Sequence, residues 1–261
     1  YRRFIRPFDL SVAPLLRAQL VANPGGQPVL LVDIHHIVSD GVSGRILDRE
    51  VHAMLNREEL PPLRIQYKDY ACWQEAGREQ GVMAQQEAYW VERFAGEIPI
   101  LDLPIDFPRP QVQQFEGDVF NLGSSPEEAR RIKELAEETG TTVFMVMLGV
   151  FHVLLYRLSN QDDIIIGTPV AGRSHADLEP VVGMFVNTLA LRLQSPGKLA
   201  FGDFLEDVKT VTLDAFKNQD YPFEELVEKI ALHRDTGRNP LFDVMFSFNR
   251  LNAPETEPVH D

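Results

Sequence analysis

Two adjacent histidines, followed closely by an aspartate and a glycine, form the part of this chain best suited to proton chemistry. Residues 35–41 are His-His-Ile-Val-Ser-Asp-Gly. An imidazole with a pKa near 6.5 can accept a proton at the pH of a cell. Gly41 would let a substrate approach the backbone closely, and N–H groups at a helix start can stabilise a tetrahedral oxyanion. The residue types therefore indicate a histidine base, with Asp40 as a supporting group and Gly41 as an oxyanion contact.

Other interpretations of the same residues stay open. His35 and His36 can be a structural pair at a strand end, with Asp40 as the N-cap of the next helix. A metal site would need both histidines on one ion, but successive side chains of a strand point to opposite faces. The same alternation leaves only one of the two histidines to face a given cleft. Ser43 as a nucleophile lacks the Gly-x-Ser-x-Gly pattern, because Gly44 follows it at once.

Residues 35–41 lie between a predicted hairpin and a predicted helix. Residues 15–22 alternate as a strand, residues 23–27 (Asn-Pro-Gly-Gly-Gln) are a turn signal, and residues 29–35 form the returning strand. A helix is expected at about residues 44–55. This order places the histidines at a strand end beside a helix N-terminus, where developing negative charge is stabilised.

The rest of the chain mixes predicted helices and strands, which indicates an α/β fold with sheets partly covered by helices. A stretch with four prolines, residues 98–114, cannot be regular throughout, so we expect two lobes, residues 1–110 and 111–261. Further strands are expected near 118–122, 163–168, 186–193 and 243–248. Further helices are expected at 67–79, 83–94, 125–138, 142–158, 201–217 and 223–232.

Composition excludes several classes of function. The 261 residues carry a net charge of −14, with 25 basic against 39 acidic side chains, which argues against nucleic acid as a partner. The sequence contains no run of eighteen apolar residues, so a membrane span is not predicted. Cys72 is the only cysteine, so a disulfide framework is impossible and a cytoplasmic location is expected. The chain begins at Tyr1 without an initiator Met, and we expect it to be a piece of a longer protein.

The sequence resembles the condensation domain of nonribosomal peptide synthetases, within the chloramphenicol-acetyltransferase-like superfamily. Residues 35–41 match the signature His-His-x-x-x-Asp-Gly in full. Six further stretches resemble the family in its own order: Pro-Phe-Asp-Leu at 7–10, Tyr-Lys-Asp-Tyr-Ala at 67–71, Ile-Gly-Thr-Pro-Val-Ala-Gly-Arg at 166–173, Gly-Met-Phe-Val-Asn-Thr-Leu at 183–189, Asn-Gln-Asp-Tyr-Pro-Phe-Glu at 218–224, and Arg-Asp-Thr-Gly-Arg-Asn-Pro-Leu-Phe at 234–242.

This resemblance implies two chloramphenicol-acetyltransferase-like lobes, here incomplete, and amide-bond formation between a donor acyl thioester and an acceptor aminoacyl thioester. Each substrate would arrive on the phosphopantetheine arm of a donor or acceptor peptidyl carrier protein, beside an adenylation domain of the same synthetase. The chain itself would bind no cofactor and no metal. His36, the second histidine, would deprotonate the acceptor amine or orient it. The Gly41 N–H would contact the oxyanion.

The resemblance also implies supporting roles and alternatives. Arg173 is expected to pair with Glu179 or to line the cleft between lobes, and Asn187 to bond a substrate amide or shape a turn. In the family, the motif aspartate is thought to pair with an arginine from an N-terminal portion that this chain lacks, so Asp40 is expected to be without that partner.

Epimerisation domains share the two histidines, but they do not usually carry the stretches at 167–173 and 238–242. Cyclisation domains, which have aspartates in place of the histidines, are excluded. Epimerisation and a non-catalytic module that docks carrier proteins therefore remain as alternatives to condensation.

Overall fold

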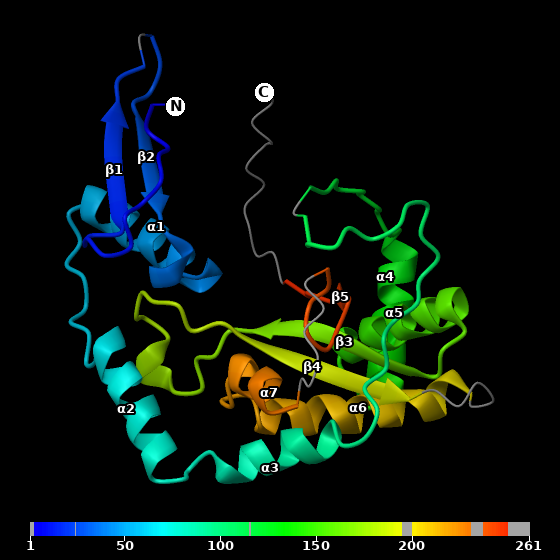
Figure 1. The fold of residues 1–261 in the computed structure, drawn as a ribbon. Helices are drawn as coiled ribbons and strands as arrows, with labels where there is room; N and C mark the ends of the chain where they lie inside the picture. The colour runs from blue at the N-terminus through cyan, green and yellow to red at the C-terminus, as the bar shows by residue number, and fades with distance from the viewer. Residues whose placement is uncertain (1–2, 24, 115, 195–199, 231–236, 250–261) are drawn as a thin grey trace. The chain divides into compact units, whose positions relative to one another are not determined.

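The computed structural model describes residues 3–23, 25–114, 116–194, 200–230 and 237–249, and these residues form an α/β fold (Figure 1). In chain order the elements are β1 (Leu16–Val21), β2 (Val29–Ile34), α1 (Gly41–Leu55), α2 (Tyr67–Glu79), α3 (Ala84–Arg93), α4 (Pro126–Glu138), α5 (Val143–Ser159), β3 (Asp163–Val170), β4 (Asn187–Gln194), α6 (Phe201–Lys217), α7 (Phe223–Ile230) and β5 (Val244–Met245). The predicted α/β class is confirmed.

The chain divides into two compact units, and each unit is assembled from two separate stretches. The first unit contains residues 1–83 and 171–187, and the second contains residues 84–170 and 188–261. This division differs from the predicted boundary at residue 110. The reason is α3, which packs on α7 and whose Trp90 Nε1 donates a hydrogen bond to the Asn218 carbonyl at 2.8 Å. Residues 84–110 therefore fold with the second unit.

In the first unit, β1 and β2 form the predicted antiparallel hairpin. Leu16 pairs with Ile34 at one end of the register, and Val21 pairs with Val29 at the other. The His35 N–H donates to the Leu15 carbonyl at 3.0 Å, so the pairing continues one residue beyond β2. The hairpin thus delivers the histidines at the end of a paired strand, as the sequence predicts.

Helix α1 begins at Gly41, three residues before the predicted start at Gly44. Asp40 is its N-cap, in extended backbone conformation, and its side chain accepts the Ser43 N–H. A carboxylate in that position satisfies a donor that the first turn of a helix leaves without a partner, and its charge suits the helix dipole. The predicted N-cap role of Asp40 is confirmed.

The second unit is built on a three-stranded sheet with the order β4-β3-β5. The isoleucine run Ile164–Ile166 of β3 is buried, as expected for a strand covered on both faces. The apolar helix α5 packs against β3, α4 and α6. Helix α4 starts at the predicted capping box, in which Ser125 and Glu128 bond each other's backbone N–H groups and Pro126 occupies the first turn.

Two predicted strands differ from the structure. Residues 118–122 form no strand, and the apolar side chains of Val119, Phe120 and Leu122 are exposed. The predicted strand at 243–248 is reduced to Val244–Met245, which pairs in parallel with Ile166 and Gly167. An apolar run forms a strand only where a neighbouring strand accepts its hydrogen bonds, and sequence pattern does not supply that neighbour.

Across the described ranges, no single helix is long and apolar enough to cross a membrane. Only α4 and α5 taken together meet that length and composition, and they are bent by 106° relative to each other.

Candidate active site

The two histidines have different backbone surroundings. His35 is extended (φ −68°, ψ 135°), and its Nδ1 accepts the Ile37 N–H at 3.1 Å. Its ring meets the edge of Phe8, with centroids 6.0 Å apart. His36 already belongs to a single 3₁₀ turn, His36–Val38, and its side chain is exposed. The argument from alternating side chains required both histidines to be extended, and this condition is not met, because the 3₁₀ turn begins at His36.

The hydrogen bond of His36 decides which of its nitrogens can act as a base. Its Nδ1 lies 2.7 Å from the Ser39 carbonyl oxygen. A carbonyl oxygen can only accept, so Nδ1 carries the proton of the neutral ring and Nε2 keeps a lone pair. Within the described residues no partner is recorded for Nε2. His35 is the opposite case, because its Nδ1 lone pair is already used by the Ile37 N–H.

Asp40 lies directly after this turn, and five hydrogen bonds hold its buried carboxylate. Oδ1 accepts the Ser43 N–H at 2.7 Å and the Ser43 hydroxyl at 2.8 Å. Oδ2 accepts the Phe185 N–H at 3.2 Å. Arg173 Nη2 donates to both oxygens, at 3.1 and 3.2 Å. The expectation that Asp40 lacks an arginine partner is wrong, since Arg173 of this same chain supplies it.

Arg173 is itself held on every side. Its Nη1 donates to the carbonyls of Leu178 and Val181, each at 2.6 Å, and its guanidinium lies 4.1 Å from the centre of the Phe185 ring. Its side chain is 5% exposed. The expected pairing with Glu179 is replaced by the pairing with Asp40, so Arg173 joins residues 171–187 to the start of α1.

The Asp40 carboxylate is ionised at neutral pH. Burial alone would raise its pKa above the ordinary value. The hydrogen bonds from the backbone and hydroxyl of Ser43, the Phe185 N–H and the charge of Arg173 outweigh burial and hold the pKa of Asp40 below 3.8. A negative charge is therefore fixed beneath the first turn of α1.

Ser43 and Tyr67 belong to the same cluster, although the sequence does not single them out for it. Ser43 is fully buried, and its hydroxyl also accepts the Gly183 N–H at 3.0 Å. Burial excludes Ser43 as an accessible nucleophile. The Tyr67 hydroxyl donates to the Met184 carbonyl at 2.8 Å. The only available signal was the position of Ser43 three residues after the N-cap, where helix starts favour a bond to the capping side chain.

Gly41 opens α1 beside this cluster and is exposed. A Cβ added there would meet no atom within 4 Å. The N–H groups of Gly41 and Val42 lie in the first turn, where a helix provides no acceptor for them. Gly41 thus begins the helix at an exposed position on the same short segment as His36.

Asn187 is the first residue of β4 and is half-buried, two residues beyond Phe185. Its predicted contact with a substrate amide stays a prediction. Part of one predicted motif, residues 234–236, lies outside the described residues.

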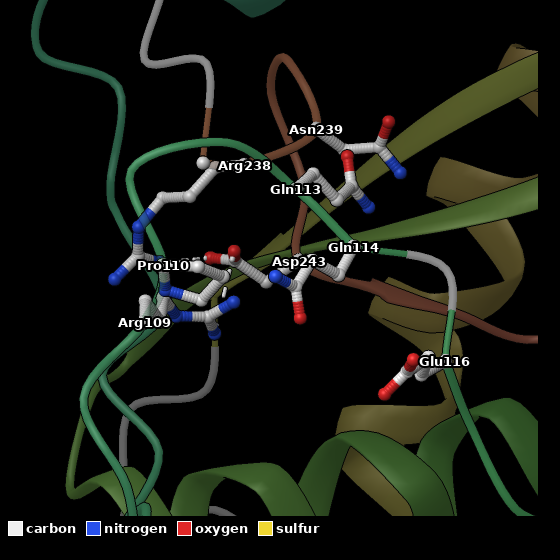
Figure 2. Close-up of a pocket in the computed structure, with 9 residues that line it drawn as sticks. Arg109, Pro110, Gln113, Gln114, Glu116, Arg238, Asn239 and Asp243 are labelled. Atoms are coloured by element: carbon white, nitrogen blue, oxygen red, sulfur yellow. Dashed lines mark hydrogen bonds and ion pairs between the residues drawn. The ribbon is translucent and has the colours of Figure 1, made fainter.

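The second unit contains a separate cavity of about 400 Å³ (Figure 2). Asp243 sits between two arginines there, 2.7 Å from Arg238 Nη1 and 3.5 Å from Arg109 Nη2. Gln113, Gln114 and Asn239 line the same cavity. None of the predicted site residues lines it. Within the described ranges, no group of three or more His, Cys, Asp or Glu side chains is placed to hold a metal ion.

Comparison with known proteins agrees with this arrangement. Residues 1–258 match the sequence profile of the family described as Condensation domain. The chain is 50% identical over 256 residues to tyrocidine synthase 3 of Brevibacillus parabrevis, a match that covers 98% of this chain and 4% of that protein. It is 50% identical over 254 residues to gramicidin S synthase 2 of Brevibacillus brevis, a match that covers 97% of this chain and 6% of that protein. The chain therefore spans only a small part of the length of these relatives.

Two solved structures share the fold. One is holo-AB3403, a four-domain nonribosomal peptide synthetase bound to AMP and glycine, with a TM-score of 0.84 and 29% identity over 95% of this chain and 19% of that one. The other is the X-domain from teicoplanin biosynthesis, with a TM-score of 0.82 and 26% identity over 94% of this chain and 57% of that one. The resemblance seen in the motifs is confirmed: the chain belongs to the condensation-domain family.

Proposed function

We propose that this chain catalyses amide-bond formation between a donor acyl thioester and an acceptor aminoacyl thioester in nonribosomal peptide synthesis. The observation that carries the proposal is the Nε2 lone pair of His36, which is exposed and whose tautomer is set by the Ser39 carbonyl. Family membership supports it, because the matched relatives include tyrocidine synthase 3 and gramicidin S synthase 2, and one solved structure with the same fold is named a nonribosomal peptide synthetase. Both thioesters would be carried on phosphopantetheine arms of peptidyl carrier proteins, with an adenylation domain in the same synthetase.

The reaction joins a nitrogen to a carbonyl carbon and releases a thiol. The acceptor amine attacks the donor thioester, His36 Nε2 takes the amine proton, and the N–H of Gly41 donates to the oxyanion. When the C–S bond breaks, the leaving thiolate takes the proton that His36 Nε2 received from the amine. Proton transfer of this kind contributes about 10²–10⁴-fold. Holding both thioesters together contributes comparably or more.

The test is the His36→Ala variant of the full-length protein, assayed for dipeptidyl product on loaded donor and acceptor carriers. We expect product formation to fall by at least about 10²-fold, because the proton acceptor is gone. His52→Ala is the matched control, since His52 is an exposed histidine of the same unit near the other end of α1. Near-normal product from His36→Ala would remove His36 from the reaction.

The same assay separates the alternatives. Inversion of a carrier-bound residue without a new amide bond would identify epimerisation. If the wild type and the variant both bind loaded carriers but form neither a new amide bond nor an inverted residue, the chain is a docking module. Either outcome would overturn condensation as the activity of this chain.

A second test concerns Gly41. Gly41→Ala adds a methyl group in open space, so we expect the fold to be retained and the product rate to fall if the oxyanion approaches this backbone. Gly44→Ala is the matched control, because it makes the same change in the same helix, also without a clash. Equal rates in the two variants would show that no substrate atom comes close to Gly41.

A further inference from the structure

Ser43 occupies an unusual position for a serine in a helix, because its whole side chain is enclosed. It is the third residue of α1 and is fully buried. Its hydroxyl oxygen lies 2.8 Å from Asp40 Oδ1, 2.9 Å from the Gly183 carbonyl, 3.0 Å from the Gly183 N and 3.2 Å from Arg173 Nη2. Four polar groups from three parts of the first unit therefore converge on one hydroxyl.

A hydroxyl has one proton and two lone pairs, so its bonds can be assigned. It accepts from the Gly183 N–H and from Arg173, which uses both lone pairs. Its single proton is shared between Asp40 Oδ1 and the Gly183 carbonyl, which lie 2.8 and 2.9 Å from the hydroxyl oxygen. The backbone N–H of Ser43 also donates to Asp40 Oδ1. Through this N–H and its hydroxyl, Ser43 fixes the Asp40 carboxylate with respect to the backbone of α1 and to Gly183.

The backbone of Asp40 connects this cluster to His36. The Ser39 carbonyl and the Asp40 N–H belong to one planar peptide unit. That carbonyl accepts the Nδ1 proton of His36 at 2.7 Å. Rotation of this plane about the Asp40 backbone would move the carbonyl away from His36. Asp40 resists that rotation because its side chain is held by Ser43 and Arg173 and because it caps α1.

We propose that Ser43 is a positioning residue, which sets the tautomer and the ring orientation of His36 through Asp40 and the Ser39 carbonyl. The proposal rests on the proposed function of His36 and adds a residue that touches neither substrate nor the reacting atoms. Removing the Ser43 hydroxyl takes away one of the five hydrogen bonds on the Asp40 carboxylate and the bonds that tie this carboxylate to Gly183, so the Asp40 peptide is held less firmly. The Ser39 carbonyl then no longer selects the Nδ1–H form of His36, and the basic Nε2 lone pair is present only part of the time.

The experiment compares Ser43→Ala with wild type in the full-length protein, using ¹⁵N-histidine NMR and steady-state kinetics on loaded carriers. The ¹⁵N shifts distinguish the Nδ1–H tautomer from the Nε2–H tautomer, and a His36→Gln sample assigns the signal. We expect mixed tautomers at His36 and a fall in kcat of roughly tenfold to hundredfold, with KM for the carriers little changed. Ser43→Cys, which keeps the volume and a weak donor, is expected to lie between Ser43→Ala and wild type.

Thr168→Val is the control for simple loss of a buried hydroxyl. Thr168 is buried in the second unit and donates to the Phe246 carbonyl at 2.9 Å. We expect this variant to lose stability while the His36 signal and kcat stay as in wild type.

An unchanged His36 tautomer in folded Ser43→Ala overturns the proposal, whether or not kcat falls. If Ser43→Ala does not fold, Ser43→Cys is judged by the same signal. The proposed function fails separately: near-normal product from His36→Ala would remove the catalytic role of His36, while a tautomer change in the Ser43 variants would still show the positioning.

Discussion

At the scale of single residues, the site depends on which nitrogen each histidine has available. The alternation of side chains along a strand left one of the two histidines to face a cleft, and the family resemblance pointed to His36. The premise of alternation does not hold, because His36 starts a 3₁₀ turn. The hydrogen bond at Nδ1 is a better criterion for the catalytic histidine. The Nδ1 atom accepts a hydrogen bond in His35 and donates one in His36. Sequence pattern places a histidine at a strand end but cannot show the direction of a hydrogen bond three residues further on.

The pairing of Asp40 with Arg173 is also a property that sequence could not supply. The two residues are 133 positions apart, and each looks ordinary in its local pattern. The resemblance to the family pointed toward an arginine partner but placed it outside this chain. Local reasoning correctly predicted the N-cap role of Asp40, because capping depends only on the next three residues.

Asp40→Ala is expected to lower the free energy of unfolding by about 3–5 kcal/mol, because it leaves the guanidinium of Arg173 buried without its carboxylate. Urea unfolding of the full-length protein measures the change. Asp48→Ala on the same helix is the control, since Asp48 is exposed and should alter stability little. An unchanged unfolding midpoint in Asp40→Ala would show that the pair adds no net stability.

At the scale of elements, most helices and strands follow from periodicity and end signals. The hairpin, the capping box of α4 and the buried run of β3 were all predictable, because each depends on nearby residues. The strands at 118–122 and 243–248 were not, because pairing partners are chosen by the tertiary fold. The joining of residues 171–187 to the first unit is of the same kind. Its irregular backbone carries Arg173 to Asp40, and no hydrophobic pattern records that path.

Gly172 is the residue on which this irregular path depends. Its φ is +63°, and a Cβ there would lie 1.8 Å from the Phe185 carbonyl oxygen. Gly172→Ala is therefore expected to destabilise the first unit by roughly 2 kcal/mol or more and to disturb the Phe185 N–H bond to Asp40. Gly202→Ala in α6 is the control, because a Cβ there meets nothing within 4 Å. Hydrogen exchange of residues 171–187 measures the effect, and equal protection in the two variants would contradict it.

At the scale of the whole molecule, each unit encloses a side chain whose protonation affects stability: Asp40 in the first unit, as an anion, and His152 in the second, as a neutral ring. Asp40 of the first unit is buried as an anion, with its pKa held below 3.8 by Ser43, Phe185 and Arg173 against the effect of burial. His152 of the second unit is fully buried on α5 between β4 and α6. Its Nε2 is 3.3 Å from the Leu193 carbonyl, and its ring centre is 5.0 Å from that of Phe204. Its Nδ1 has no hydrogen-bond partner among the described residues.

The pKa shifts of these two groups predict that the second unit begins to lose stability at a higher pH than the first. Burial lowers the pKa of His152 below 6.5, more than the Leu193 carbonyl and the charge of Asp163 raise it. Below pH 6.5 the unfolded chain therefore binds a proton that the folded second unit rejects, so acidification favours unfolding until the folded pKa is passed. For Asp40 the loss begins only near pH 3.8, because its unfolded carboxyl takes up a proton there and its folded carboxylate does not.

Hydrogen exchange measured from pH 7 down to pH 4 should accordingly show α5 and β4 losing protection before the start of α1. His152→Leu removes the titrating ring from an apolar site and is expected to flatten this loss in the second unit while the first unit behaves as in wild type. Asp40→Asn gives the reciprocal comparison, with the first unit altered and the acid response of α5 retained. An identical pH dependence of α5 in wild type and His152→Leu would mean that some other group controls the second unit, and that burial of this histidine has no part in its response to acid.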